Sequence, residues 1–218
     1  MKTRQLWLTL FLAAVSLALA LPASAQQILY ENGPINGTQD AWTINDGFAV
    51  SDTFTISTGT SAVTGFSFGA WLFPGDVLES VEISVTSNEF GGTMYFDQVV
   101  NFTASNCSGN QYGYNVCTET GSFVNGPTLA NGTYWANLSN AVVNTRDPVY
   151  WDENSGIGCH SEGCPSQPSE NTYGTIPAES FSVLGTSSGQ GSVPEPGSLL
   201  LFASGILGVG GLLKRKLS

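Results

Sequence analysis

An alternation of apolar and polar side chains constrains this chain more than any other feature of its sequence. In several short stretches every second residue is apolar, and the clearest are 54–56, 66–72, 81–85, 112–116, 134–138 and 181–183. A period of two puts these side chains on one face of a β-strand, whereas an amphipathic helix repeats them every three or four residues. Strands with one apolar face need a second sheet to cover them. The sequence therefore predicts an all-β fold.

Turn sequences separate these stretches at short intervals. They are Asn36-Gly37, Asp46-Gly47, Pro74-Gly75-Asp76, Gly91-Gly92, Asn125-Gly126-Pro127 and Asn131-Gly132. Such pairs favour tight turns between antiparallel strands, and about nine or ten short strands fit between residues 26 and 184. We expect one domain there, an antiparallel β-sandwich that is jelly-roll-like. A closed barrel is the alternative.

Residues 1–25 have the order of features that is typical of a secretory signal peptide. Basic residues precede an apolar run, and the segment ends on small residues at Ala23 and Ala25. We predict cleavage by signal peptidase before Gln26, which makes residues 26–184 an extracytoplasmic domain. An anchor helix that stays uncleaved is the alternative.

A second apolar segment, 197–213, is followed at once by Lys214, Arg215 and Lys216. A helix of this length reaches roughly 25 Å, enough to cross a thin bilayer with the basic cluster as a membrane stop on the cytoplasmic side. A buried core helix is the alternative. Residues 185–192, rich in Gly and Ser, are expected to form a flexible spacer before this segment.

Pro194, Glu195 and Pro196 stand directly before the apolar segment. The order of this motif, an apolar helix and a basic cluster over residues 193–218 resembles the PEP-CTERM sorting signal. The resemblance implies export across the inner membrane, anchoring by the helix, and processing by an exosortase near the Pro-Glu-Pro motif. It also implies a bacterium that secretes polysaccharide, and a mature protein at the cell surface or in the extracellular matrix.

The charges of the chain are distributed unevenly. Between residues 26 and 192 the chain has sixteen acidic residues and one base, Arg146, because the other bases lie in the two targeting segments. A surface of that sign repels nucleic acid and anionic lipid. It suits neutral glycans and divalent cations, so we expect extracellular polysaccharide rather than nucleic acid as a partner.

All four cysteines lie in the exported region, where thiols become oxidised. Four cysteines allow three pairings, and the short separations favour Cys107 with Cys117 and Cys159 with Cys164. With His160, the second pair could instead bind a transition metal. Export favours the disulfide, so no metal is assigned there.

Residues 146–154 combine aromatic, acidic and amide side chains. Tyr150 and Trp151 could stack on sugar rings while Asp152, Glu153 and Asn154 bind the hydroxyl groups. The same three polar side chains offer the hard oxygen ligands that Ca²⁺ prefers, so Ca²⁺ is the one cofactor that the sequence suggests. A third interpretation is structural, a strand that ends in a polar turn with one ring in the core.

The sequence favours a non-catalytic protein. A single histidine, His160, argues against Ser-His-Asp and Cys-His catalysis. Because glycoside hydrolysis needs only two carboxylates, an extracellular carbohydrate-active enzyme that uses Asp152 or Glu153 is one alternative. A structural spacer domain without a ligand is another. We expect a surface or matrix protein that associates with extracellular polysaccharide.

Overall fold

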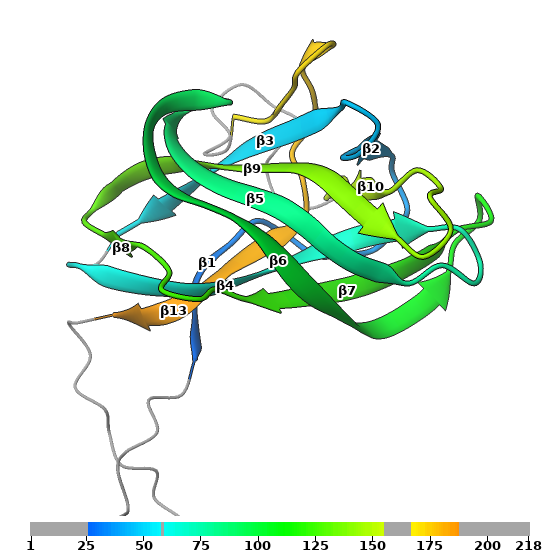
Figure 1. Cartoon of the computed structure of the whole chain (residues 1–218), viewed down its shortest axis with the longest axis horizontal. Helices are drawn as coiled ribbons and strands as arrows, with labels where there is room; N and C mark the ends of the chain where they lie inside the picture. Colours follow the sequence, from blue (N-terminus) through cyan, green and yellow to red (C-terminus); the bar gives the residue numbers. More distant parts are fainter. Residues whose placement is uncertain (1–25, 58, 155–166, 188–218) are drawn as a thin grey trace, which may run out of the picture. The chain divides into compact units, whose positions relative to one another are not determined.

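Figure 1 shows the computed structural model of the chain, which describes residues 26–57, 59–154 and 167–187. These residues form strands, turns and irregular connections, and none of them is helical. Their strands are β1 (Gln27–Glu31), β2 (Ala41–Thr43), β3 (Ala49–Ile56), β4 (Ser61–Leu72), β5 (Leu78–Asn88), β6 (Gly91–Gly109), β7 (Asn115–Ser122), β8 (Thr128–Leu129), β9 (Gly132–Val143), β10 (Tyr150–Asp152), β11 (Ser169–Glu170), β12 (Gly174–Thr175) and β13 (Phe181–Ser187). The all-β prediction is confirmed.

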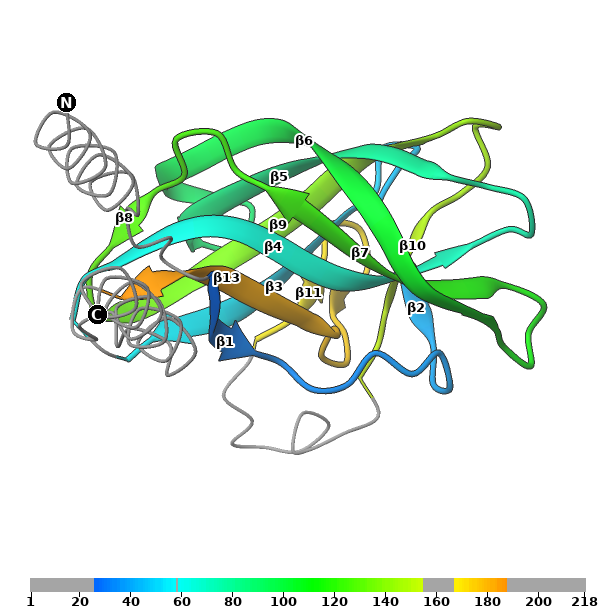
Figure 2. The ribbon, with the colours of Figure 1, turned by 90° about the horizontal axis from the view of Figure 1, so that it is seen from below.

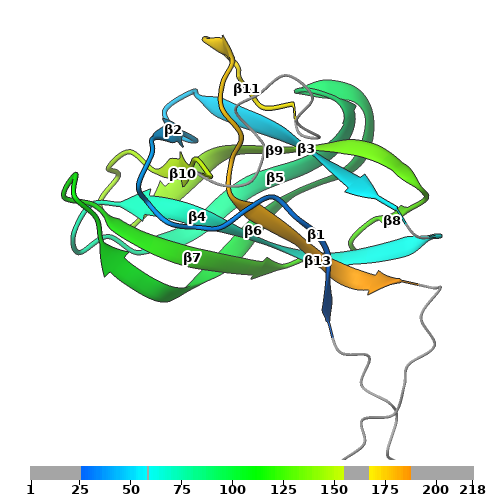
Figure 3. The same ribbon diagram turned by 180° about the vertical axis from the view of Figure 1, so that it is seen from behind.

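The strands form one antiparallel sheet that curls on itself. Its order is β1-β13-β4-β7-β6-β5-β9-β3-β11-β12, while β10 pairs with β2 and β4, and β8 pairs with β4. Strands β3, β9 and β5 lie over β13, β4 and β7 in Figure 1, and Figure 3 shows the two layers from behind. The antiparallel arrangement is as predicted, and the jelly-roll connectivity stays a prediction.

The long strand β6 joins the two layers. Asn101 is the last residue of β6 that pairs with β5, and Phe102 is the first that pairs with β7. Phe96, Val100 and Phe102 are buried, so β6 keeps one face on the core while it passes from one layer to the other. This course is visible in Figure 2.

The core between the layers follows the alternation that the sequence shows. On β5, the side chains of Val81, Ile83 and Val85 are buried, while Glu82 and Ser84 are partly exposed. Removing a large apolar side chain from water contributes on the order of 2 kcal/mol, which fixes the face that each strand turns inward. The largest fully buried side chains include Phe54, Phe66, Phe68, Trp151 and Phe181.

Tyr112 and Tyr114 depart from the predicted alternation. The pattern placed them in a strand, but β7 begins at Asn115 and both tyrosines lie in the turn before it. Gly113 has a φ angle of +89° in this turn, and the Asn110 side chain accepts hydrogen bonds from the backbone N–H groups of both tyrosines. Local hydrogen bonds of this kind compete with strand pairing, which leaves the two rings outside the core.

The last strand is longer than the sequence suggested. Residues 185–187 of β13 pair with residues 61–63 of β4, so β13 extends three residues into the segment predicted as a spacer. Backbone pairing needs no apolar side chain, so small polar residues can continue a strand. The described residues, 26–57, 59–154 and 167–187, belong to one compact unit.

Several predictions lie outside the described residues. They are the signal peptide at 1–25, the Cys159–Cys164 pair, the remainder of the spacer, the Pro194–Glu195–Pro196 motif, the apolar helix 197–213 and the basic cluster Lys214–Arg215–Lys216. Within the ranges that the structure describes, no helix is long and apolar enough to cross a membrane.

Candidate functional site

The side chains of residues 150–154 point in different directions, although they are adjacent in sequence. Tyr150 is partly exposed, whereas Trp151, Asp152, Glu153 and Asn154 are buried. Because successive side chains of a strand point to opposite faces, β10 turns Trp151 into the core and places Tyr150 on the other face. The predicted glycan or calcium contact is therefore not a continuous surface.

Trp151 is a core residue. Its ring lies edge-on to Phe66, Phe68 and Phe181, with ring centroids 6.0, 6.1 and 5.6 Å apart, and its Nε1–H donates a 3.0 Å hydrogen bond to the carbonyl oxygen of Ser180. With an exposed fraction of 0%, the indole offers no face to a sugar.

Asp152 holds a loop segment, residues 33–38, against the outside of β4, and we call this segment the strap. Its carboxylate accepts four hydrogen bonds, from the backbone N–H groups of Asn36 and Gly37, from Trp71 Nε1 and from Ser180 Oγ, at 3.1, 3.0, 2.6 and 3.0 Å. Burial raises the pKa of Asp152, and these hydrogen bonds lower it. The donors occupy both oxygens, which favours the structural interpretation of Asp152.

Glu153 and Asn154 also bind within the protein. Glu153 Oε1 accepts a 2.7 Å hydrogen bond from Trp42 Nε1, and Asn154 Nδ2 donates to the carbonyl oxygens of Asn32 and Glu179 at 2.6 and 3.3 Å. Among the residues that the structure describes, no three His, Cys, Asp or Glu side chains lie close enough together to hold a metal ion. This geometry does not favour calcium at residues 152–154.

Tyr150 instead belongs to a group of five rings, which we call the aromatic cluster. Tyr112 stacks on Trp71 with ring centroids 5.5 Å apart and an interplanar angle of 20°, and Tyr114 contacts both Trp71 and Tyr150 at 5.6 and 5.5 Å. Phe73 completes the cluster at 5.0 Å from Tyr114. The rings come from the end of β4, the β6–β7 turn and the start of β10, which meet at one end of the body (Figure 2).

The aromatic cluster is open to solvent on one side. Tyr112 is 52% exposed, while Trp71 beneath it is 4% exposed, and Phe73, Tyr114 and Tyr150 have intermediate exposure. Burial, followed by the hydrogen bond and charge interaction with Tyr114 and by the charge of Asp46, raises the pKa of Tyr150 to about 12. The Tyr150 phenol therefore stays neutral at physiological pH and serves as a hydrogen-bonding group on an apolar ring.

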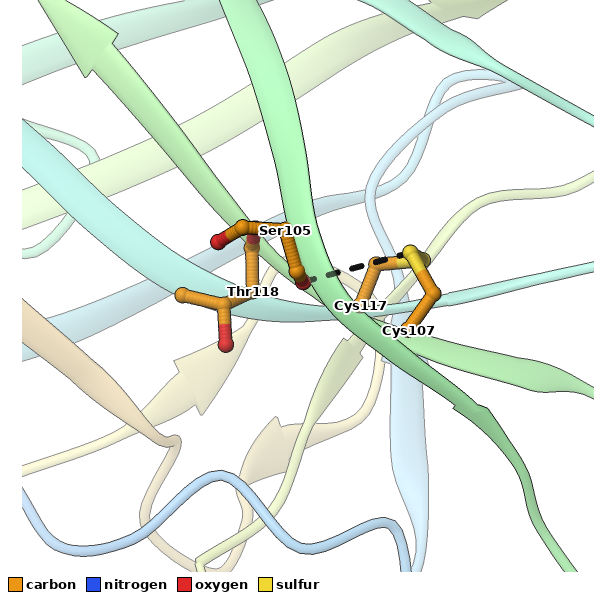
Figure 4. Close-up of a disulfide and its surroundings, with 4 residues drawn as sticks. All are labelled: Ser105, Cys107, Cys117 and Thr118. Carbon is orange, nitrogen blue, oxygen red and sulfur yellow. Dashed lines mark hydrogen bonds between the residues drawn. A yellow bond between two sulfur atoms is a disulfide. The ribbon is translucent and has the colours of Figure 1, made fainter.

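A disulfide lies at the base of the turn that carries Tyr112 and Tyr114. Cys107 and Cys117 are bonded between β6 and β7, as Figure 4 shows, so this predicted pairing is confirmed. Within the turn, Asn110 Nδ2 also donates a 3.3 Å hydrogen bond to the carbonyl oxygen of Gly37 in the strap. Both attachments restrain the position of the exposed rings.

The strap passes close to β7 beneath these attachments. Gly37 has a φ angle of +65°, and a Cβ atom at this position would overlap the Val116 side chain. Only glycine fits here without strain, so the Asn36-Gly37 pair that the sequence marks as a turn also allows the strap to approach the sheet.

Among the buried carboxyl groups that the sequence analysis did not single out, two have no hydrogen-bond partner for either oxygen. Glu119 on β7 and Glu179 before β13 are fully buried, and no side-chain oxygen of either has a hydrogen-bond partner. Burial raises the pKa of Glu119 to about 7. A signal for Glu119 was present, because Cys117, Glu119 and Gly121 share one face of the strand by their period of two.

Comparison with known proteins identifies the C-terminal segment. Residues 192–216 match the family model of the PEP-CTERM protein-sorting motif, and no curated protein matches the chain. The motif implies an exported protein whose C-terminal sorting signal holds it in the membrane until an exosortase processes it. The chain therefore carries a PEP-CTERM sorting motif at residues 192–216, after an antiparallel all-β body.

Proposed function

We propose that the β-sheet body associates, without catalysis, with polysaccharide at the cell surface or in the extracellular matrix. The observation that carries this proposal is the aromatic cluster, in which Tyr112 is 52% exposed above a buried Trp71. Aromatic rings present an apolar face to the C–H groups of a sugar, while their polar ends bind its hydroxyl groups. Rings held by the fold lose little conformational entropy on binding.

The position of the acidic groups supports a binding role over hydrolysis. Asp152 and Glu153, either of which could have supplied one carboxylate of a catalytic pair, are buried and hydrogen-bonded to protein donors. A glycosidase needs two carboxyl groups on either side of the scissile bond. The aromatic cluster instead offers partly exposed rings on a turn that the Asn110 side chain holds in place.

The test is co-sedimentation of the purified protein with the polysaccharide that its producer secretes. We expect saturable binding by the wild-type protein and weaker binding by the Tyr112→Ala, Tyr114→Ala double variant. Each ring is worth about 1 kcal/mol, so loss of both corresponds to a roughly thirtyfold weaker Kd.

Tyr95→Ala is the matched control, because Tyr95 is an exposed tyrosine on β6 that contacts Tyr134 outside the aromatic cluster. It should bind as the wild-type protein does. Equal binding by the double variant would remove the aromatic cluster as the contact site. Absence of binding by the wild-type protein would refute the polysaccharide role itself.

A further inference from the structure

Glu179 lies where the two ends of the curled sheet approach each other. It lies two residues before the start of β13. Its backbone N–H donates a 3.0 Å hydrogen bond to Asp52 Oδ2 on β3. Its carbonyl oxygen accepts hydrogen bonds from Asn32 Nδ2 and Asn154 Nδ2 at 2.8 and 3.3 Å, and its backbone forms a β-bridge with Glu153. We call these five residues the seam.

The seam links parts of the fold that are distant in the order of the strands. Asn32 follows β1, which is one end of that order, whereas Asp52 belongs to β3, near the other end. Asn32 Nδ2 also donates a 3.0 Å hydrogen bond to Asp52 Oδ2, and the Asn32 backbone N–H donates to the carbonyl oxygen of Phe181. The seam therefore closes the open side of the curl.

The side chain of Glu179 contrasts with its well-bonded backbone. It is fully buried, and neither carboxyl oxygen has a hydrogen-bond partner. The charged groups that act on it are all acidic, Asp52 from β3, Asp152 and Glu153 from the β10 segment, and Asp40 from the segment before β2. The single base among the described residues, Arg146, is exposed between β9 and β10.

A carboxylate at this position would be a buried charge without a donor, next to further acids. Such a group avoids this state by keeping its proton, because a neutral carboxyl group is far less costly to bury than a charged one. Accordingly, burial first, and then the charges of Asp52, Glu153, Asp152 and Asp40, raise the pKa of Glu179 well above its ordinary value.

We propose that Glu179 is a proton-operated latch, which keeps the seam closed while its carboxyl group is protonated and loosens the seam when the proton passes to solvent. The sign of the effect follows from linkage, since the folded protein binds this proton at pH values where the unfolded chain has released it. Stability is therefore complete below about pH 4.5 and declines as the pH rises, by up to about tenfold in the folding constant per pH unit.

Amide hydrogen exchange of the full-length protein in a mild nonionic detergent tests the latch. The amides to follow are those of Asn32, Asn154 and Glu179, at about pH 5 and about pH 8, with correction for intrinsic exchange rates. All variants carry Glu119→Gln, because ionisation of Glu119 would lower protection in the same pH range. In this background we expect the protection of these amides to fall at least about tenfold at the higher pH. The further change Glu179→Gln, which removes the ionisable group, should abolish this fall.

Glu89→Gln in the same background is the matched control, because Glu89 is exposed in the β5–β6 hairpin, and it should lose protection as the Glu119→Gln protein does. An equal loss of protection with and without Glu179→Gln would overturn the latch. So would protection at high pH that appears with added Ca²⁺ and disappears with a chelator, because the seam would then be a cation site.

Infrared spectroscopy gives a second measurement that does not require Glu179→Gln to fold. In a Glu119→Gln background, the folded protein at neutral pH should show the carbonyl band of a protonated carboxylic acid, and unfolding should abolish it. A folded protein without this band would also overturn the proposal.

Discussion

Replacement of Glu119 by glutamine should make the protein more resistant to unfolding at alkaline pH but not at acidic pH. Glu119 lies on β7 between Phe68 of β4 and Ala104 of β6, its exposed fraction is 0%, and its two carboxyl oxygens have no hydrogen-bond partner. Burial therefore raises its pKa from 4.5 to about 7.

The sign and size of the effect follow from this pKa. Because the folded protein holds this proton more tightly, the contribution of Glu119 to the free energy of unfolding is constant below about pH 4.5, declines between about pH 4.5 and 7, and is constant again above that range. A pKa of about 7 against 4.5 corresponds to at most about 3 kcal/mol at roughly 1.4 kcal/mol per pKa unit. Relaxation of the folded protein around the buried charge lowers this value, so we expect about 2 kcal/mol.

Urea unfolding followed by tryptophan fluorescence measures this free energy across the pH range. The difference between Glu119→Gln and wild type should increase in favour of the variant by about 2 kcal/mol from pH 5 to pH 8. A buried amide has unsatisfied groups of its own, which adds an offset that does not vary with pH. The slope is therefore the diagnostic quantity, and parallel profiles for variant and wild type would refute the reasoning.

Two other changes probe the structures that position the aromatic cluster. Asp152→Asn replaces an acceptor oxygen with a donor, so two of the four donors now bound to Asp152 lose their partner. We expect the free energy of unfolding in urea to fall by about 2 to 4 kcal/mol, and hydrogen exchange at the Gly37 amide to become faster. Replacing Cys107 and Cys117 together by serine should lower the free energy of unfolding by about 2 to 3 kcal/mol. It should also weaken polysaccharide co-sedimentation, because the turn that carries Tyr112 loses one of its attachments. Unchanged binding would show that Asn110 alone holds the turn.

The fold class was predictable because a strand that is buried on one face alternates apolar and polar residues in the sequence. The side chains of Val81, Ile83 and Val85 are buried as that alternation indicates. Tyr112 and Tyr114 show the same alternation by coincidence. They lie in a turn, on either side of Gly113 with its positive φ angle. Periodicity could not separate these cases, whereas the Asn and Gly content around the tyrosines could have indicated a turn.

The candidate site was only partly predictable, for a geometric reason. Tyr150 and Trp151 are successive residues of a three-residue strand, so at most one of them could contribute to a given face. The sequence does not indicate which one faces the core. That depends on the register, in which Tyr150 lies opposite Trp71 and Trp151 lies opposite Ala70, and strand register is set by long-range pairing.

The burial of acidic residues changes the electrostatic interpretation of the sequence. Six of the sixteen acids between residues 26 and 192 are buried, and two of these, Glu119 and Glu179, have a raised pKa and no hydrogen-bond partner. The surface is therefore less negative than a count of acids indicates. The scarcity of bases, more than the excess of acids, disfavours nucleic acid as a partner. Phosphate binding requires several lysine or arginine side chains, and the described residues contain one such side chain, Arg146. Since a less negative surface repels anionic polymers less strongly, acidic polysaccharides belong beside neutral ones among the candidate ligands to test against the proposed role of the aromatic cluster. Stacking on Tyr112 depends on the faces of the sugar rings and not on their charge.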